Sequence, residues 1–251
     1  MGELDAWREM DRTATFWWRD DDSVNEDPAI DFMLTVRRRL QIPLAISAVP
    51  TSTDALFAEA VLAESDVWVL QHGYAHHDQA PTGEKKCEFA GNRAKRVVCE
   101  ELCAGARLLE DLFGARSLPV LVPPWNRIHE DWIRELPRLG YRGLSLFAPR
   151  SMAYAAPGIR VVNTHVDVID WRGTREYVGL KDALGRVVSH LRKRRRNDVD
   201  ADEPTGLLTH HLVHDAHCWA FLEELVGRTM THPAARWLNA AYIFSCGQDK
   251  N

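Results

Sequence analysis

The feature that most constrains the fold is an alternation, from Thr15 onward, of short apolar runs with longer stretches of helical period. This alternation is typical of βα units around a mainly parallel sheet. The expected strands are Thr15 to Trp18, Pro43 to Ala48, Val67 to Gln71, Pro119 to Val122, Gly143 to Phe147, Ile159 to Asn163 and Gly206 to His210. The expected helices are Ala29 to Leu40, Thr53 to Glu64, Asn92 to Phe113, Glu130 to Leu139, Lys181 to Arg195 and Ala216 to Arg228.

No stretch of linker composition separates these units. A chain of 251 residues, 45% of them hydrophobic, has the usual length of a barrel of alternating strands and helices. We therefore expect an α/β fold, a single distorted (β/α) barrel domain of about seven strands that spans residues 1–251.

Charge and hydropathy argue against two classes of partner. A net charge of -5 does not indicate a surface that binds nucleic acid. We expect the basic run Leu191 to Arg196 to be a solvated helix end. No apolar run reaches the roughly 18 residues that cross a bilayer, and the N-terminus is acidic where a signal peptide would be basic. We expect no membrane partner and a cytoplasmic location.

The odd number of cysteines predicts free thiols at Cys87, Cys99, Cys103, Cys218 and Cys246.

Three consecutive carboxylates, Asp20, Asp21 and Asp22, follow an apolar run that contains two tryptophans. Adjacent carboxylates repel one another, so a cation or a proton must offset their charge at the end of a buried strand. A surface turn or a helix N-cap is the alternative interpretation.

Two histidines four residues apart, His72 and His76, follow the strand expected at Val67 to Gln71. This spacing can present two nitrogens to one cation, although core or surface histidines would also explain it. Together with an aspartate from another strand end, the pair forms a two-histidine, one-carboxylate set that leaves coordination positions open.

Three further strand ends are polar. They carry the turn Pro123-Pro124-Trp125-Asn126-Arg127, the pair Asp170-Trp171, and the pair His210-His211. Each has a structural alternative in a rigid turn, a capping aspartate or buried histidines. In a barrel all of these strand ends open on one face, which is where active sites lie.

The order of these motifs, from about Phe16 to His211, resembles the polysaccharide deacetylases, the carbohydrate esterases of the chitin and peptidoglycan deacetylase group. The matching motifs are Asp21-Asp22, His72 with His76, Pro124-Trp125, Asp170-Trp171, and Leu208 with His210. Arg19-Asp20, Gly73 and Val122 depart from that pattern, which has Thr-Phe, Ser or Thr, and arginine at those places. Arg19 or Arg127 then supplies the missing charge, the register among Asp20, Asp21 and Asp22 stays open by one residue, and the chain is a divergent member.

The resemblance implies removal of an acetyl group from an N-acetylated sugar or polysaccharide. Asp22, His72 and His76 would bind one divalent cation. Zinc is the expected metal, and cobalt, nickel and manganese are the alternatives. Asp21 would act as the base, the Trp125 N–H as the oxyanion donor, and His210, or failing it His211, as the acid.

Supporting roles follow for the remaining motif residues. Arg19 belongs to the catalytic group, and Asp170 would orient His210 or a nearby arginine. The expected substrate contacts are Trp171, Tyr74, Leu208, Asn126 and Arg127. The alternatives are an amidase that acts on a small non-sugar amide and a catalytically silent carbohydrate-binding relative. The oligomeric state stays open.

Overall fold

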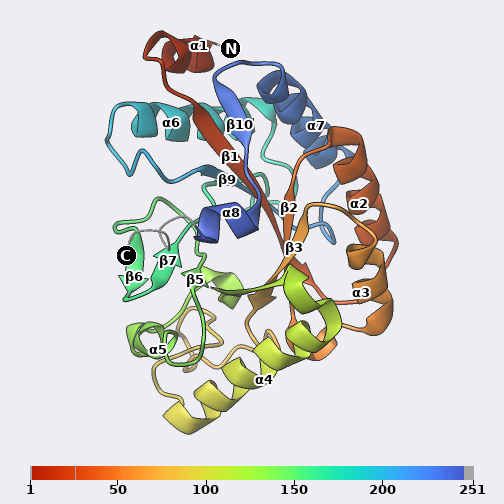
Figure 1. Ribbon diagram of the computed structural model, residues 1–251, viewed down its shortest axis with the longest axis vertical. Helices are drawn as coiled ribbons and strands as arrows, with labels where there is room; N and C mark the ends of the chain where they lie inside the picture. Colours follow the sequence, from red (N-terminus) through yellow and green to blue (C-terminus); the bar gives the residue numbers. More distant parts are fainter. Residues whose placement is uncertain (1, 26, 246–251) are drawn as a thin grey trace.

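The computed structural model describes residues 2–25 and 27–245, which form a mixed α/β fold around a central, mostly parallel sheet (Figure 1). The hydrogen-bonded strand order is β6-β7-β5-β4-β3-β2-β1-β9-β8, and β10 pairs with β1. The strands are β1 Ala14–Ser23, β2 Leu44–Ala48, β3 Val67–His72, β4 Ser117–Val122, β5 Gly143–Leu144, β6 Tyr154–Ala156, β7 Ile159–Val161, β8 Val166–Asp167, β9 Thr205–Thr209 and β10 Ala235–Trp237.

Helices pack around this sheet. They are α1 Gly2–Glu9, α2 Pro28–Leu40, α3 Ala55–Leu62, α4 Lys95–Phe113, α5 Glu130–Glu135, α6 Leu180–Arg195, α7 Ala216–Met230 and α8 Ala240–Ser245. Asp27, Asp54 and Asp215 cap α2, α3 and α7 by accepting backbone N–H bonds, the usual role of aspartate at a helix start. Among the described helices, none has the length and apolar character needed to cross a membrane.

All of the expected strands and helices are present, with shifts at their ends. The largest shift is in β1, which continues through the carboxylate run to Ser23 because Arg19 and Asp20 pair with both β2 and β9. The short helices α1 and α8 and the short strands β6, β8 and β10 were not predicted from the sequence.

The segment between β7 and β8 relates the two sides of the sheet. Thr164 donates its backbone N–H to Leu146, which follows β5, whereas His165 donates its backbone N–H to Gly206 of β9. The same stretch of chain therefore contacts β5 and β9, and the sheet curls into a barrel-like shape.

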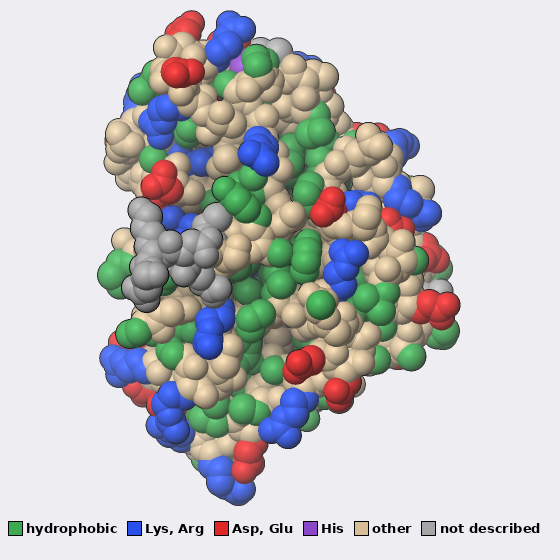
Figure 2. Space-filling model, in the orientation of Figure 1, with side chains coloured by type: hydrophobic (Ala, Val, Ile, Leu, Met, Phe, Trp, Pro, Cys, Tyr) green, Lys and Arg blue, Asp and Glu red, His purple; other side chains and the backbone are tan. Residues whose placement is uncertain are grey.

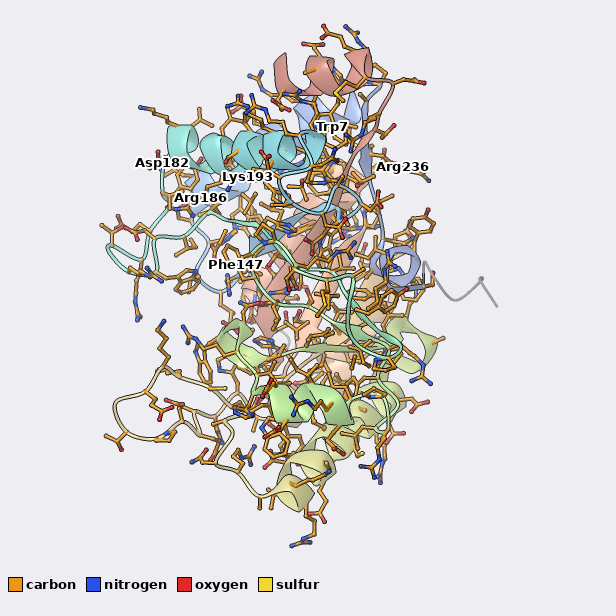
Figure 3. The ribbon with its side chains drawn as sticks, turned by 90° about the vertical axis from the view of Figure 1, so that its left-hand side faces the viewer. Trp7, Phe147, Asp182, Arg186, Lys193 and Arg236 are labelled. Carbon is orange, nitrogen blue, oxygen red and sulfur yellow. The ribbon has the colours of Figure 1, made fainter. Side chains whose placement is uncertain are left out.

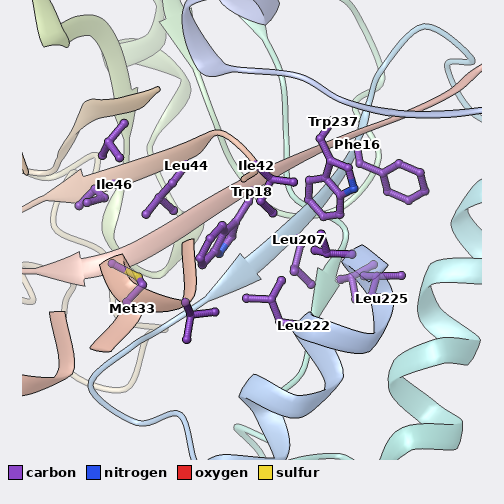
Figure 4. Close-up of a cluster of buried hydrophobic side chains, with 14 of the residues drawn as sticks. Phe16, Trp18, Met33, Ile42, Leu44, Ile46, Leu207, Leu222, Leu225 and Trp237 are labelled. Atoms are coloured by element: carbon purple, nitrogen blue, oxygen red, sulfur yellow. The ribbon is translucent and has the colours of Figure 1, made fainter. Parts of the chain in front are cut away.

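Side chains of β1 alternate between two cores. Phe16 and Trp18 lie in the core between the sheet and the outer helices, where Figure 4 shows them with Leu207 and Trp237. Trp17 points to the opposite, inner face and packs against α8, which lies across that face in Figure 1. This alternation decides which residues of the carboxylate run face inward.

The basic run at the end of α6 is not simply solvated, so that expectation was wrong in part. Arg194 is buried and donates to Thr15, Ala201 and Thr205, which fastens α6 to the starts of β1 and β9. Arg195 pairs with Glu3 of α1. On the face drawn in Figure 2, acidic and basic side chains are interspersed.

The four described cysteines, Cys87, Cys99, Cys103 and Cys218, are free, as expected. Cys246 lies outside the described residues.

Candidate metal centre and its catalytic groups

Because side chains alternate along β1, the residues of the carboxylate run point to different faces of the sheet. Arg19 and Asp21 share the inner face of β1 with Trp17, whereas Asp20 shares the outer face with Trp18. Asp20 and Asp21 are both buried, but they face different surroundings.

Asp22 ends the alternation because its backbone takes a φ of 68°, in the left-handed region. Its Oδ1 lies 2.9 Å from Nε2 of His72 and 3.1 Å from Nε2 of His76. The three ligand atoms lie within 4.8 Å of one another, so the geometry places Asp22, rather than Asp20 or Asp21, beside the histidines. This geometry favours the register Asp21-Asp22 over Asp20-Asp21.

His72 is oriented by its second ring nitrogen. Nδ1 donates to the backbone oxygen of Val122 at 3.0 Å, which fixes the tautomer and leaves Nε2 for a ligand, as is usual for metal-binding histidines. Burial lowers the pKa of His72, but its hydrogen bond to Asp22 and the charges of Asp21 and Asp22 outweigh burial and raise that pKa. Burial raises the pKa of Asp22, and both histidines more than reverse that effect.

His76 lies at the open side of the site, with 28% of its side chain exposed. Its ring is tilted against Trp125 at a centroid distance of 4.6 Å. Trp125 and Asn126 have φ values of 56° and 55°, in the turn that follows Pro123 and Pro124. This turn brings the predicted oxyanion donor beside a predicted metal ligand.

Glu88 supports the loop after His72. Its buried carboxylate accepts the backbone N–H of Tyr74 at 3.1 Å and of Ala75 at 2.8 Å. Gly73 has a φ of 63°, and a Cβ at that position would lie 1.9 Å from Oε2 of Glu88. Glu88 therefore occupies the space in which the Ser or Thr side chain of the related motif would begin.

Arg19 holds the inward carboxylate. Its Nη2 donates to Oδ2 of Asp21 and to Oδ1 of Asn126, each at 2.8 Å, and its Nη1 donates to Oγ of Ser145 at 2.6 Å. Arg127 instead donates to the backbone of Lys86. Of the two arginines proposed to replace the missing one, the structure therefore places Arg19 at the site.

The structure places two of the predicted substrate contacts, Asn126 and Leu208, near the proposed catalytic groups. Asn126 accepts from Arg19, so its carbonyl oxygen helps to fix the guanidinium group. Leu208 is buried in β9, on the inner face next to the strand end that carries His210.

The end of β9 carries His210 on the inner face, and His210 is flanked by two residues that bind Asp20. The Thr209 hydroxyl donates to Oδ2 of Asp20, and Nδ1 of His211 donates to Oδ1 at 2.6 Å. The backbone N–H of His211 also donates to Oδ2 at 3.1 Å. His211 is thus engaged with Asp20 and buried, whereas the His210 ring lies against Trp171 at 4.8 Å.

Asp167, which was not predicted as a site residue, lies closer to His210 and Trp171 than the sequence indicated. Asp170 accepts the backbone N–H of Gly173 in an exposed turn, and the structure does not bring it to His210. Asp167 is buried at the inner end of β8, accepts the indole N–H of Trp171 at 2.7 Å and interacts with the charge of His210. Burial raises the pKa of Asp167 even though His210 opposes it.

The comparisons with known proteins concern the fold. No family model matches the chain, and no curated protein is significantly similar to it in sequence. A putative polysaccharide deacetylase from Mycobacterium smegmatis matches at 14% identity and a TM-score of 0.63, over 93% of this chain and 89% of that one. The peptidoglycan N-acetylglucosamine deacetylase Bc1960 matches at 13% identity and a TM-score of 0.58, over 96% of each chain.

The fold is that of the polysaccharide deacetylases. Puue allantoinase is similar to the chain to the same degree, at 14% identity and a TM-score of 0.63, over 92% of this chain and 89% of that one. Two kinds of hydrolase therefore share this fold. Because one fold can carry several reactions, the function must be argued from the site.

Proposed function

We propose that this chain is a metal-dependent hydrolase that removes the acetyl group from an N-acetylated sugar. The observation that carries the proposal is the arrangement of Asp22, His72 and His76 around one point, beside the inward-facing Asp21. Asp21, predicted as the base, lies on an inward-facing position of β1, and His210, predicted as the acid, directly follows the neighbouring strand β9.

The donor set fits a divalent cation. Two imidazole nitrogens and one carboxylate oxygen are ligands that zinc and related cations accept, and three protein ligands leave room for water and substrate. A cation bound there would polarise the acetyl carbonyl and lower the pKa of a water molecule. We propose zinc, with cobalt, nickel and manganese as alternatives, and a family 4 acetyl xylan esterase from Clostridium thermocellum with this fold was solved with cobalt.

Asp21 is the proposed base that takes the proton from the attacking water. Its Oδ2 is held by Arg19 at 2.8 Å, and its Oδ1 has no hydrogen-bond partner within residues 2–25 and 27–245. One oxygen is therefore fixed and the other is free to accept a proton. The buried Arg19 also offsets the charge of Asp21 beside Asp22.

His210 is the proposed acid that protonates the departing amine. Trp171 packs against the His210 ring. Asp167 accepts the indole N–H of Trp171 and so orients this pair of rings. Trp171 is 40% exposed, so part of the indole is open to a sugar ring or an acetyl methyl group. The backbone N–H of Trp125 is the proposed donor to the tetrahedral oxyanion.

A second candidate is hydrolysis of a small non-sugar amide with the same residues. The fold of this chain is as similar to Puue allantoinase as to the Mycobacterium smegmatis protein, with equal TM-scores, and this supports the second candidate. A silent carbohydrate-binding protein would need neither Asp21 nor His210, so their retention supports turnover.

The test is acetate release from N-acetylglucosamine and its oligomers, beside a panel of non-sugar amides, with metal-free and zinc-loaded protein. We expect zinc-dependent acetate release that is lost in His210→Ala and kept in His129→Ala, which changes an exposed histidine on another element. Turnover of non-sugar amides alone would favour the second candidate. Sugar binding without turnover of any substrate would overturn both.

A further inference from the structure

A hollow of the surface lies along α6, and its lining does not include Asp22, His72 or His76. Its volume is about 580 Å³, within the range of small-molecule sites. Figure 3 shows Asp182, Arg186 and Lys193 along this helix, with Phe147 below them. Pro149 and His165 also line the hollow.

Three cations border this hollow, which we call the α6 groove. Lys181, Arg186 and Lys193 line it, and Asp182 is the one acidic side chain in its lining. Within residues 2–25 and 27–245, none of the three cations forms an ion pair with a carboxylate. Arg186 donates to the backbone oxygen of Asp167, which holds its guanidinium group at the groove.

The floor of the groove contains a buried histidine with an unused nitrogen. His190 is 5% exposed, and its Nε2 has no hydrogen-bond partner among the described residues. Arg194 donates to Oγ1 of Thr205, which lies 3.0 Å from Nδ1 of His190. Because no other described residue accepts from this hydroxyl, we assign it as the donor to Nδ1. The neutral ring therefore carries its proton on Nε2, as a donor that lacks an acceptor.

His190 is neutral for a physical reason. Burial and the neighbouring charges of His165, Arg194 and Lys193 lower its pKa to about 2. His165 stacks on it at 3.7 Å and also has a lowered pKa, chiefly through burial. The floor thus offers an N–H donor, while the positive charge is on the rim.

Helix geometry sets the size of the ligand. Arg186, His190 and Lys193 follow at intervals of four and three residues, so they share one face of α6. Arg186 and Lys193 are about 10 Å apart along the axis at roughly 1.5 Å per residue. Gly185 leaves open space beside them, because a Cβ there would meet nothing within 4 Å.

We propose that the α6 groove binds a small molecule through a phosphate or diphosphate group held by Arg186, His190 and Lys193. Three cations and an N–H donor match the charge and the several acceptor oxygens of a phosphate better than those of a carboxylate. Arg186 contacts the backbone of Asp167, so the bound phosphate lies next to the strand that carries Asp167 toward His210. This binding site does not depend on the proposed deacetylation.

The test is isothermal titration calorimetry of the zinc-loaded full chain with inorganic phosphate, pyrophosphate and glucose 6-phosphate. We expect saturable binding that Lys193→Glu weakens at least tenfold. Arg196→Glu is the matched control, because it makes the same charge change at an exposed residue next to α6 and should leave binding unchanged. Tighter binding of glucose 6-phosphate than of inorganic phosphate would identify an organic phosphate as the ligand.

A second variant separates the groove from the metal centre, where phosphate can also bind a cation. His72→Ala removes a proposed metal ligand and should keep the phosphate affinity. Absence of binding by the wild-type chain would overturn the proposal. So would affinity that persists in Lys193→Glu, or that is lost in His72→Ala.

Discussion

At the scale of single residues, Arg19 explains how the site does without the arginine of the related third motif. It comes from the strand that also supplies Asp21, so the charge partner and the proposed base are two residues apart on one inner face. The sequence showed Arg19 and Arg127 as equal candidates. Choosing between them required the position of the Pro123-Pro124 turn, which points Arg127 to Lys86 and brings Asn126 to Arg19.

We predict that Arg19→Gln lowers kcat at least tenfold and destabilises the chain by about 3 kcal/mol, because it leaves the buried Asp21 without its cation. Chemical denaturation and steady-state kinetics measure the two effects. In the double variant Arg19→Gln with Asp21→Asn, much of the stability should return, since no buried carboxylate is left unpaired. Additive destabilisation by the two changes would show that the pair is not coupled.

We also predict that Gly73→Ala destabilises the chain by about 3 kcal/mol or more, because the new Cβ meets Glu88 and the backbone has a positive φ. Gly83→Ala is the matched control: its φ is also positive, but no atom lies within 4 Å of the added Cβ. It should cost roughly 1 kcal/mol by the same denaturation measurement. Equal costs would refute the role given to Glu88.

At the scale of elements, the sequence predicted the strands and helices that have a clear period and missed those too short to show one. A strand of two residues, such as β8, has no alternation, and this is why Asp167 was not singled out. The choice between Asp21-Asp22 and Asp20-Asp21 likewise depended on where the alternation along β1 ends. β1 itself runs to Ser23, but its side-chain alternation breaks at the left-handed backbone of Asp22, which composition does not reveal.

The pairing of β1 with β9 positions the proposed acid. Asp20 and Thr209 are register partners, and Asp20 binds residues on both sides of His210. We predict that Asp20→Asn lowers kcat more than it changes KM, because His210 loses its fixed position while the metal ligands remain. Metal content should be unchanged, and Asp27→Asn, at a helix cap on the same connection, should leave kcat unaltered. Wild-type turnover in Asp20→Asn would contradict this positioning role.

At the scale of the whole molecule, buried neutral histidines make stability depend on pH. The pKa of His190 is about 2 in the folded chain, below its ordinary value of 6.5, chiefly through burial. Between these values the unfolded chain binds a proton that the folded chain does not, so the free energy of unfolding falls as pH falls below 6.5. Above pH 6.5 this contribution is constant.

We predict that, from pH 7 to pH 5 in a buffer without phosphate, the wild-type chain loses about 2 kcal/mol more stability than His190→Gln, at about 1.4 kcal/mol per pH unit. Urea denaturation at both pH values gives this difference. His77→Gln, a change at an exposed histidine, should follow the wild-type slope. Parallel slopes for wild type and His190→Gln would mean that His190 is protonated in the folded chain.

In the proposed function, Asp22, His72 and His76 hold one divalent cation on which hydrolysis depends. The most direct measurement is the zinc content of the reconstituted chain, taken together with acetate release, in the wild type, His72→Ala and the exposed neighbour His77→Ala. We expect about one zinc ion per chain and full activity in the wild type and His77→Ala, with both lost in His72→Ala. Zinc binding and activity that survive in His72→Ala would contradict it.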